Sequence, residues 1–307
     1  MAVVPEFALG LAALGRPAYI NLGRDGALPA TRDVDSMRAA CHAVLDAAHA
    51  AGVRRVDAAR SYGLSESFLS EWLAERGHDD VVVSSKWGYA YVADWRADAD
   101  VHEVKEHSLS RFTRQWEETS ALIEPSRYLV HSLTADSPLF DDPALLDALG
   151  ALRARDVRVG FSTTGPRQAD TVRRALALEV DGQPLFTVVQ STWNALERSA
   201  GQALAEASAA GFEVYVKEGV ANGRLAVRPP AALRDLAREL DATPDAVALA
   251  LVAAQPWADV VLSGAASTDQ LHANLRATAL DVPADALDEL VEPAEQYWST
   301  RGSLAWT

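Results

Sequence analysis

The sequence has very little cysteine and no excess of positive charge. Cys41 is the single cysteine among 307 residues, so no disulfide framework can form, and we expect a reducing, cytoplasmic location. The formal net charge is -15, from 28 Lys and Arg against 43 Asp and Glu. This balance argues against a nucleic-acid partner, because phosphates are bound by clustered basic side chains.

Long hydrophobic runs are lacking as well. No segment approaches the ~18 consecutive apolar residues that a membrane-spanning helix needs, so we expect no membrane partner. The first ten residues have neither a basic region nor a long apolar stretch, and they do not resemble a signal peptide. No G-x-G-x-x-G loop follows the first predicted strand, which weakens the case for an open dinucleotide-binding sheet.

What is present is a regular alternation of short apolar strands with helices. Strands are predicted at 7–14, 53–57, 81–86, 127–131, 157–161, 186–190, 212–217 and 260–263. Helices are predicted at 34–51, 65–76, 101–123, 143–155, 168–178, 199–210, 230–240, 244–254, 269–277 and 284–291, with Ser65 as the cap of the second. Eight alternations indicate an α/β fold, a parallel (β/α)8 TIM barrel, and a doubly wound open sheet is the alternative.

No linker or charge block divides the chain. We therefore expect one barrel domain over residues 1–307, in which a C-terminal tail of residues 292–307 lies over or beside the barrel.

Charged side chains end three consecutive predicted strands. Asp57, Lys86 and His131 stand at these ends, and Tyr62 follows in the loop after the first of them. Active sites of such barrels lie at the carboxyl ends of strands that are ~5 Å apart, so we expect these side chains to converge. A phenol is a weak acid at neutral pH, and a nearby ammonium lowers its pKa. Taken singly, each residue has an ordinary structural explanation; together the four predict a proton-transfer site.

Six segments of the chain resemble, in order, motifs of the aldo-keto reductase family. They read DAARSYGLSE, VVVSSKWG, YLVHS, VGFSTTG, VVQSTWNALER and LSGAASTDQLHANL. The resemblance implies NAD(P)H-dependent reduction of an aldehyde or ketone to an alcohol, with a sugar or a secondary metabolite as the carbonyl compound, and without a metal. By motif match, Tyr62 would be the general acid, Lys86 would lower its pKa and Asp57 would hold Lys86. His131 would orient the carbonyl group.

The same resemblance places the cofactor along the later strands. The implied cofactor-binding residues are Ser162, Thr163, Gln190, Lys217, Glu218, Gly219, Val220, Gly223, Gly264, Ser267, Gln270 and Asn274. Lys217 is a departure, because the family usually has an aromatic ring there that stacks on the nicotinamide. The resemblance implies NADP as the cofactor. The family often has Lys or Arg for its 2′-phosphate where this chain has Ala266 and Gln270, so NAD is an alternative.

The substrate is expected to be a small carbonyl compound bound among aromatic side chains. Trp87 and Trp193 follow predicted strand ends and are predicted to line the pocket. Two other functions stay open. The chain could be a cofactor-binding accessory or sensor protein with little turnover, as the Lys217 departure suggests, or an aldolase that uses Lys86 as a Schiff-base amine. The sequence carries no signal for the oligomeric state.

Overall fold

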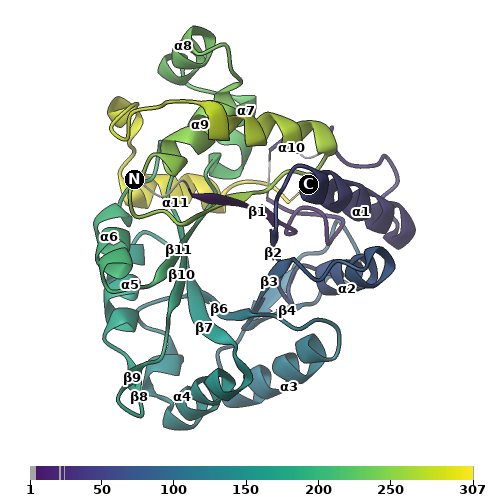
Figure 1. The fold of residues 1–307 in the computed structure, drawn as a ribbon, viewed down its shortest axis with the longest axis vertical. Helices are drawn as coiled ribbons and strands as arrows, with labels where there is room; N and C mark the ends of the chain where they lie inside the picture. The colour runs from purple at the N-terminus through teal and green to yellow at the C-terminus, as the bar shows by residue number, and fades with distance from the viewer. Residues whose placement is uncertain (1–4, 21, 24, 307) are drawn as a thin grey trace.

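The computed structural model describes residues 5–20, 22–23 and 25–306, in which eight parallel strands close into a barrel surrounded by helices (Figure 1). The order around the barrel is β1-β12-β11-β10-β7-β6-β3-β2, and the predicted (β/α)8 TIM barrel is confirmed. The barrel strands are β1 (Glu6–Gly10), β2 (Arg55–Asp57), β3 (Val82–Trp87), β6 (Arg127–Leu133), β7 (Arg158–Thr163), β10 (Val188–Thr192), β11 (Glu213–Lys217) and β12 (Val260–Ser263).

The helices pack their apolar faces on the outside of the barrel. In the first helix the buried side chains include Met37, Cys41, Val44 and Leu45, at helical spacing. Among the described residues, no helix has both the length and the apolar character needed to cross a bilayer. The helices are α1 (Val34–Ala50), α2 (Ser65–Arg76), α3 (Leu109–Ser120), α4 (Pro143–Gly150), α5 (Gln168–Leu176), α6 (Gly201–Ala209), α7 (Arg224–Val227), α8 (Ala231–Glu239), α9 (Pro244–Ala253), α10 (Thr268–Leu275) and α11 (Ala294–Gly302).

Two predicted helices are wrong in part. The segment 101–123 begins with a strand, β5 (Glu103–Lys105), which pairs antiparallel with β4 (Tyr89–Tyr91). Its helix starts only after Ser108, whose hydroxyl accepts a hydrogen bond from the Arg111 amide and so caps α3. The segment 284–291 contains a single 3-10 turn, Asp288–Leu290, and the regular helix follows later, in the tail, as α11.

The predicted cap at Ser65 is also wrong. Ser65 is already the first residue of α2, and its hydroxyl donates to the Ala59 carbonyl 3.3 Å away. Glu66 lies in the first turn as expected, but it is buried and accepts hydrogen bonds from Ser85 and Thr119. These contacts join the start of α2 to the outer face of β3, and they fix the end of the loop that carries Tyr62.

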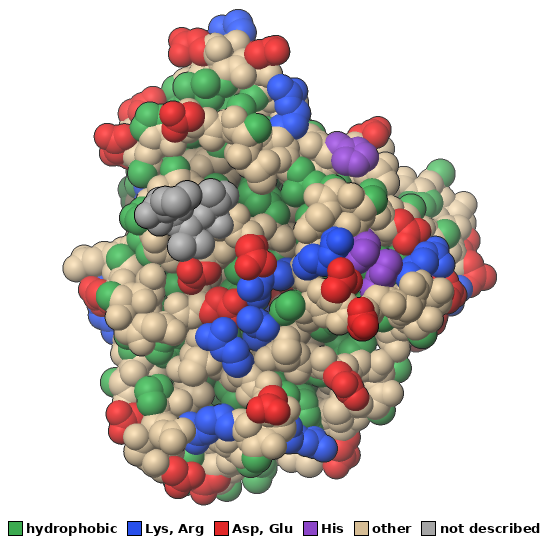
Figure 2. Space-filling model, viewed as in Figure 1, with side chains coloured by type: hydrophobic (Ala, Val, Ile, Leu, Met, Phe, Trp, Pro, Cys, Tyr) green, Lys and Arg blue, Asp and Glu red, His purple; other side chains and the backbone are tan. Residues whose placement is uncertain are grey.

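The amino ends of the barrel strands are joined by an ion-pair network. Glu213 of β11 accepts from Arg55 at 2.9 Å and from Arg127 and Arg158 at 2.8 Å each. Arg55 also bonds Glu6 at 2.6 Å. Figure 2 shows basic and acidic side chains side by side near the middle of the viewed face, over the strands labelled in Figure 1. The network closes the end of the barrel opposite the strand ends that carry Asp57 and Lys86.

Glu213→Gln should lower the free energy of unfolding by about 2 kcal/mol, because it removes the negative charge that pairs with three arginines. The expected change is a Tm about 3 °C lower in a thermal melt at pH 7. Burial alone would raise the pKa of Glu213, but the three arginines lower it. The difference between the two proteins should therefore shrink as the pH falls through that lowered pKa. Glu206→Gln, in the exposed pair with Arg173, is the matched control and should leave Tm nearly unchanged.

Candidate active site

The ends of β2 and β3 bring together an aspartate, a lysine and a tyrosine. Lys86 is fully buried, and its ammonium forms an ion pair with the Asp57 carboxylate. The same Nζ donates to the Ala58 carbonyl at 3.0 Å and lies 3.4 Å from the Tyr62 hydroxyl. Ser84 and Gln190 donate to the other Asp57 oxygen at 2.8 and 3.1 Å. The carboxylate thus fixes the ammonium beneath the phenol.

The alternation of side chains along β3 explains which residues reach this site. Ser84 and Lys86 point into the barrel, whereas Ser85 and Trp87 point outward to the helices. Trp87 packs edge-on against Phe112 of α3 at 5.1 Å between ring centroids, so its predicted place in the substrate pocket is wrong.

The prediction for Trp193 is wrong for the same reason, because Trp193 directly follows Thr192, an inward-facing residue at the end of β10. Its ring packs edge-on against Trp257 at 5.6 Å between centroids, in the hydrophobic core. The predicted substrate contact of Trp193 is therefore wrong as well.

The hydroxyl of Tyr62 keeps its proton in this environment. Burial, and then the negative charge of Asp57, raise the pKa of Tyr62 well above its ordinary value of 10. A neighbouring ammonium such as that of Lys86 favours the phenolate, but here burial and the Asp57 carboxylate outweigh it, so the net effect on the pKa of Tyr62 is a rise. Tyr62 is a neutral phenol that can give up its proton to a strong base.

An irregularity in β6 sets the position of His131. The register between β6 and β7 shifts between Val130 and Leu133, and Ser132 adopts the left-handed conformation with φ 54°. His131 Nδ1 lies 3.3 Å from the Ser61 hydroxyl, and its ring meets the Tyr62 ring edge-on at 5.5 Å. Burial, and then Lys86 and Lys217, lower the pKa of His131 well below 6.5. The imidazole is therefore neutral at pH 7.

These groups face a cavity of about 240 Å³ at the carboxyl ends of the strands. Among the residues predicted for the site, those that line it are Asp57, Tyr62, His131, Gln190, Lys217, Glu218, Gly219, Val220 and Gly264. Lys86 lies beneath the lining and reaches the cavity through Tyr62.

Six of the predicted cofactor residues do not line the cavity. Five of them use their polar groups within the fold: Ser162 accepts from the Ser132 amide, Thr163 bonds Gln168 and Ser191, Ser267 caps α10, Gln270 accepts from the Ala266 amide, and Asn274 donates to Ser263. The sixth, Gly223, packs so closely on Leu22 that an added Cβ would lie 2.3 Å from the Leu22 carbonyl oxygen. Thr164, one residue beyond the predicted pair in β7, lines the cavity instead.

The wall that contains Lys217 is built from charged groups. Glu218 has φ 57°, an uncommon conformation for a non-glycine residue, and the Arg301 guanidinium of α11 binds its carboxylate through both Nε and Nη2. Burial opposes ionisation here, but Arg301 and Lys217 lower the pKa of Glu218 to about 2. Lys217 donates to the Thr192 hydroxyl at 2.9 Å and lies 3.7 Å from Glu218. Burial lowers the pKa of Lys217 to about 8.

The sequence did not single out Arg16, Tyr19 and Arg301, which line the cavity together with Trp306 of the tail. Arg16 is buried, pairs with Glu103 at 2.6 Å and lies over the rings of Tyr19 and Trp306, at 4.6 and 5.0 Å from their centroids. Trp306 in turn stacks on His102 at 4.3 Å. The tail thus contributes both Arg301 and Trp306 to the lining. They come from irregular or terminal segments, where neither periodicity nor a strand end marks a residue.

Comparison with known proteins identifies the family of this chain. The aldo/keto reductase family matches residues 29–295. Protein tas of Escherichia coli K12 is 27% identical over 315 aligned positions, which cover 83% of this chain and 89% of that protein. Among solved structures, aldo-keto reductase AKR11C1 from Bacillus halodurans in its holo form has a TM-score of 0.66 at 20% identity, with 95% of each chain covered. The glycerol dehydrogenase AKR11B4 from Gluconobacter oxydans has a TM-score of 0.67 at 20% identity, with 92% of this chain and 90% of that chain covered. Because the family match spans most of the sequence, the chain belongs to the aldo/keto reductase family of oxidoreductases.

Proposed function

We propose that the protein reduces an aldehyde or ketone to an alcohol with NAD(P)H, and that Tyr62 is its general acid. The observation that carries this proposal is the buried chain from Asp57 through Lys86 to the Tyr62 hydroxyl, which opens into the cavity beside His131. Family membership supports the reaction class, and the arrangement of the four side chains supports the roles.

The roles follow from the charges of the four groups. A reduced nicotinamide, when bound, would supply the hydride. Tyr62 then gives its proton to the carbonyl oxygen, whose developing alkoxide is a stronger base than a phenolate. Lys86, held by Asp57, stabilises the phenolate that remains, and the neutral His131 orients the carbonyl group by a hydrogen bond.

The cavity leaves room for a cofactor beside the backbone at the end of β12. Gly264 at the end of β12 has no heavy atom within 4 Å of a Cβ added to it, so the backbone there is open to a ligand. The helix α10 contains no Lys or Arg that could form an ion pair with the 2′-phosphate of NADP. The charge-assisted bond that such a residue would add contributes about 1.5–3 kcal/mol.

The experiment that tests the proposal is a steady-state assay of NADH and NADPH oxidation over a panel of sugars, short aldehydes and ketones. We expect turnover with at least one carbonyl class, and affinities for NADH and NADPH within about tenfold of each other, as the missing basic residue implies. Cofactor binding without turnover across the whole panel would contradict the proposal.

The affinity for NAD(P)H should weaken as the pH rises through about 8. Lys217 loses its charge there, and a neutral amine no longer attracts an anionic ligand in the cavity. Titration followed by tryptophan fluorescence at pH 7 and pH 9 measures this change. In Lys217→Met the pH dependence should disappear and the affinity at pH 7 should resemble the wild-type value at pH 9. An unchanged pH profile in the variant would assign the effect to another group.

A second candidate function is a cofactor-binding sensor or accessory protein with little turnover. It is favoured by the tail, because Arg301 and Trp306 both enter the cavity and reduce the room for a carbonyl substrate. Deletion of the residues after Gly302 should raise turnover if this crowding limits it. No gain in the truncated protein, together with turnover in the full chain, would exclude the sensor role.

A further inference from the structure

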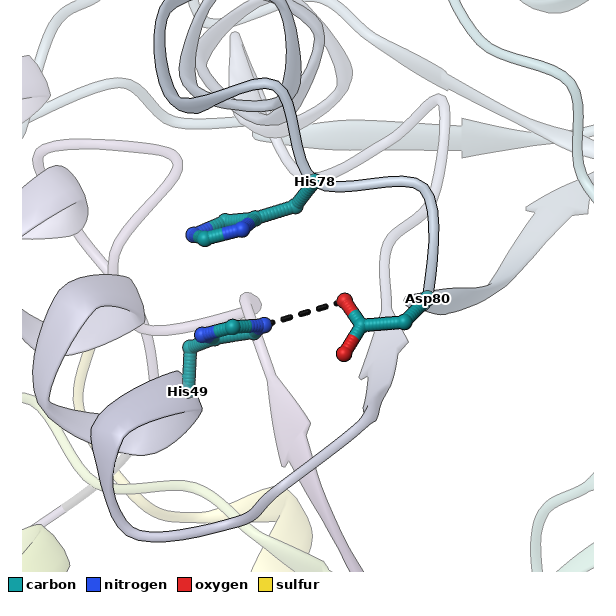
Figure 3. Close-up of side chains that lie close together, drawn as sticks. All are labelled: His49, His78 and Asp80. Atoms are coloured by element: carbon teal, nitrogen blue, oxygen red, sulfur yellow. Dashed lines mark hydrogen bonds and ion pairs between the residues drawn. The ribbon is translucent and has the colours of Figure 1, made fainter.

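Three potential metal ligands lie together at the end of the barrel away from the cavity (Figure 3). His49 is in the last turn of α1, and His78 and Asp80 lie in the turn between α2 and β3. One ligand atom of each residue lies within 4.8 Å of the other two. In the part of the chain that the structure describes, no other group of three His, Cys, Asp or Glu side chains converges in this way.

The donor atoms of this group are accessible to an ion. His49 Nε2 lies 3.0 Å from Asp80 Oδ1, and the two histidine rings are stacked with their centroids 3.6 Å apart and their planes at 21°. Figure 3 shows the rings one above the other, with the Asp80 carboxylate beside them. Within the described residues, the ring nitrogens of His78 have no hydrogen-bond partner, so their lone pair is available.

The group rests on a rigid surface. The Trp72 ring is fully buried and packs against both histidines, with centroids 6.0 Å from His49 and 4.8 Å from His78. Its indole N–H donates to Asp46 at 2.7 Å, which fixes the plane of the ring. This wall keeps both imidazoles on the same small area of the surface, although their ring planes are not yet set for an ion.

Charges around the group hold one carboxylate oxygen toward the histidines. Arg54 Nε binds Asp80 Oδ2 at 2.6 Å and leaves Oδ1 on the histidine side. A partner of this kind orients a metal-binding carboxylate. The positive charge of Arg54 opposes a cation, while Asp79, exposed in the same turn, favours one. The local charge therefore does not exclude a divalent ion.

We propose that His49, His78 and Asp80 form a binding site for a divalent transition-metal ion of the Zn²⁺ class, separate from the catalytic cavity. Two imidazoles and one carboxylate suit Zn²⁺, Ni²⁺ and Cu²⁺, whereas Mg²⁺ prefers oxygen ligands alone. Bonds of about 2.0–2.1 Å require the donor atoms to approach and the stacked rings to open. His78 lies partly exposed in a turn and can rotate to do so, and water completes the coordination. The ion would link the last turn of α1 to the turn between α2 and β3.

The test uses the full chain without a histidine tag, treated with EDTA and dialysed. Titration calorimetry with ZnCl2 should give one ion per chain, and free Zn²⁺ at about a hundred times Kd should raise Tm by about 4 °C. MgCl2 at the same concentration should do neither. Co²⁺ as a spectroscopic probe should develop visible absorption on binding.

Matched variants identify the ligands. His78→Gln and Asp80→Asn should each weaken Zn²⁺ binding at least tenfold, while His272→Gln, at an exposed histidine of α10, should bind as the wild type does. His78→Gln lies in a turn and should fold normally, which circular dichroism and carbonyl reduction can verify. Zn²⁺ binding of wild-type strength in the double variant His49→Gln/His78→Gln would overturn the proposal. A wild-type Kd weaker than about 100 µM would overturn it too.

Discussion

Tyr62→Phe should lower kcat for carbonyl reduction by roughly 10²–10⁴ while cofactor affinity stays within a few-fold of wild type. The substitution removes only the hydroxyl that lies 3.4 Å from Lys86 Nζ and faces the cavity. The alkoxide formed on hydride transfer then has no positioned acid. The buried lysine keeps its ion pair with Asp57, so the fold should be unaffected. Stopped-flow measurement of the hydride step with a saturating reduced cofactor separates chemistry from binding.

The control for this variant is a second buried tyrosine that does not reach the site. The Tyr128 hydroxyl, on β6, lies 3.4 Å from Thr119 among the helices outside the barrel. Tyr128→Phe removes the same atom from a similar environment and should retain wild-type turnover. Turnover of wild-type rate in Tyr62→Phe would refute the assignment of the general acid, whatever the control shows.

The convergence of Asp57, Tyr62, Lys86 and His131 on one cavity could be predicted from the sequence, because each of them stands at a strand end or in the loop directly after one. An apolar run that stops at Asp57, Lys86 or His131 reveals both the strand and the face of the barrel on which the side chain emerges. The eight-fold alternation revealed the barrel in the same way. The predictions that Trp87 and Trp193 line the substrate pocket were wrong, because adjacent residues of a strand point to opposite sides. Since Lys86 points into the barrel, Trp87 points outward to the helices.

The rest of the site depends on contacts that no local pattern encodes. Arg301 reaches Glu218 across 83 positions of sequence, and Arg16 reaches Glu103 across 87. The helix that delivers Arg301 lies in the tail, for which only an approximate location could be predicted. The net pKa of Tyr62 could not be predicted, because a motif specifies which groups meet and leaves open how their charges balance with burial. These quantities require coordinates.

Lys86→Met should abolish most activity and also destabilise the fold. Loss of the ammonium leaves the buried Asp57 carboxylate without its cation, a change that typically costs about 3–5 kcal/mol. Thermal melts should show Tm lower by about 6 °C. Turnover should fall by roughly 10²–10³, since the phenolate of Tyr62 loses its stabilising charge. Either result alone is ambiguous, because an unstable protein also loses activity.

The double variant Asp57→Asn/Lys86→Met separates the two effects. It removes both buried charges together, so the uncompensated carboxylate disappears, and the amide oxygen introduced at position 57 can still accept from Ser84 and Gln190. We therefore expect Tm to return most of the way to the wild-type value while turnover stays as low as in Lys86→Met. Recovery of turnover along with Tm would mean that the ion pair serves only the fold. The phenol would then need no neighbouring ammonium, and the chemistry proposed for the cavity would have to rest on Tyr62 and His131 alone.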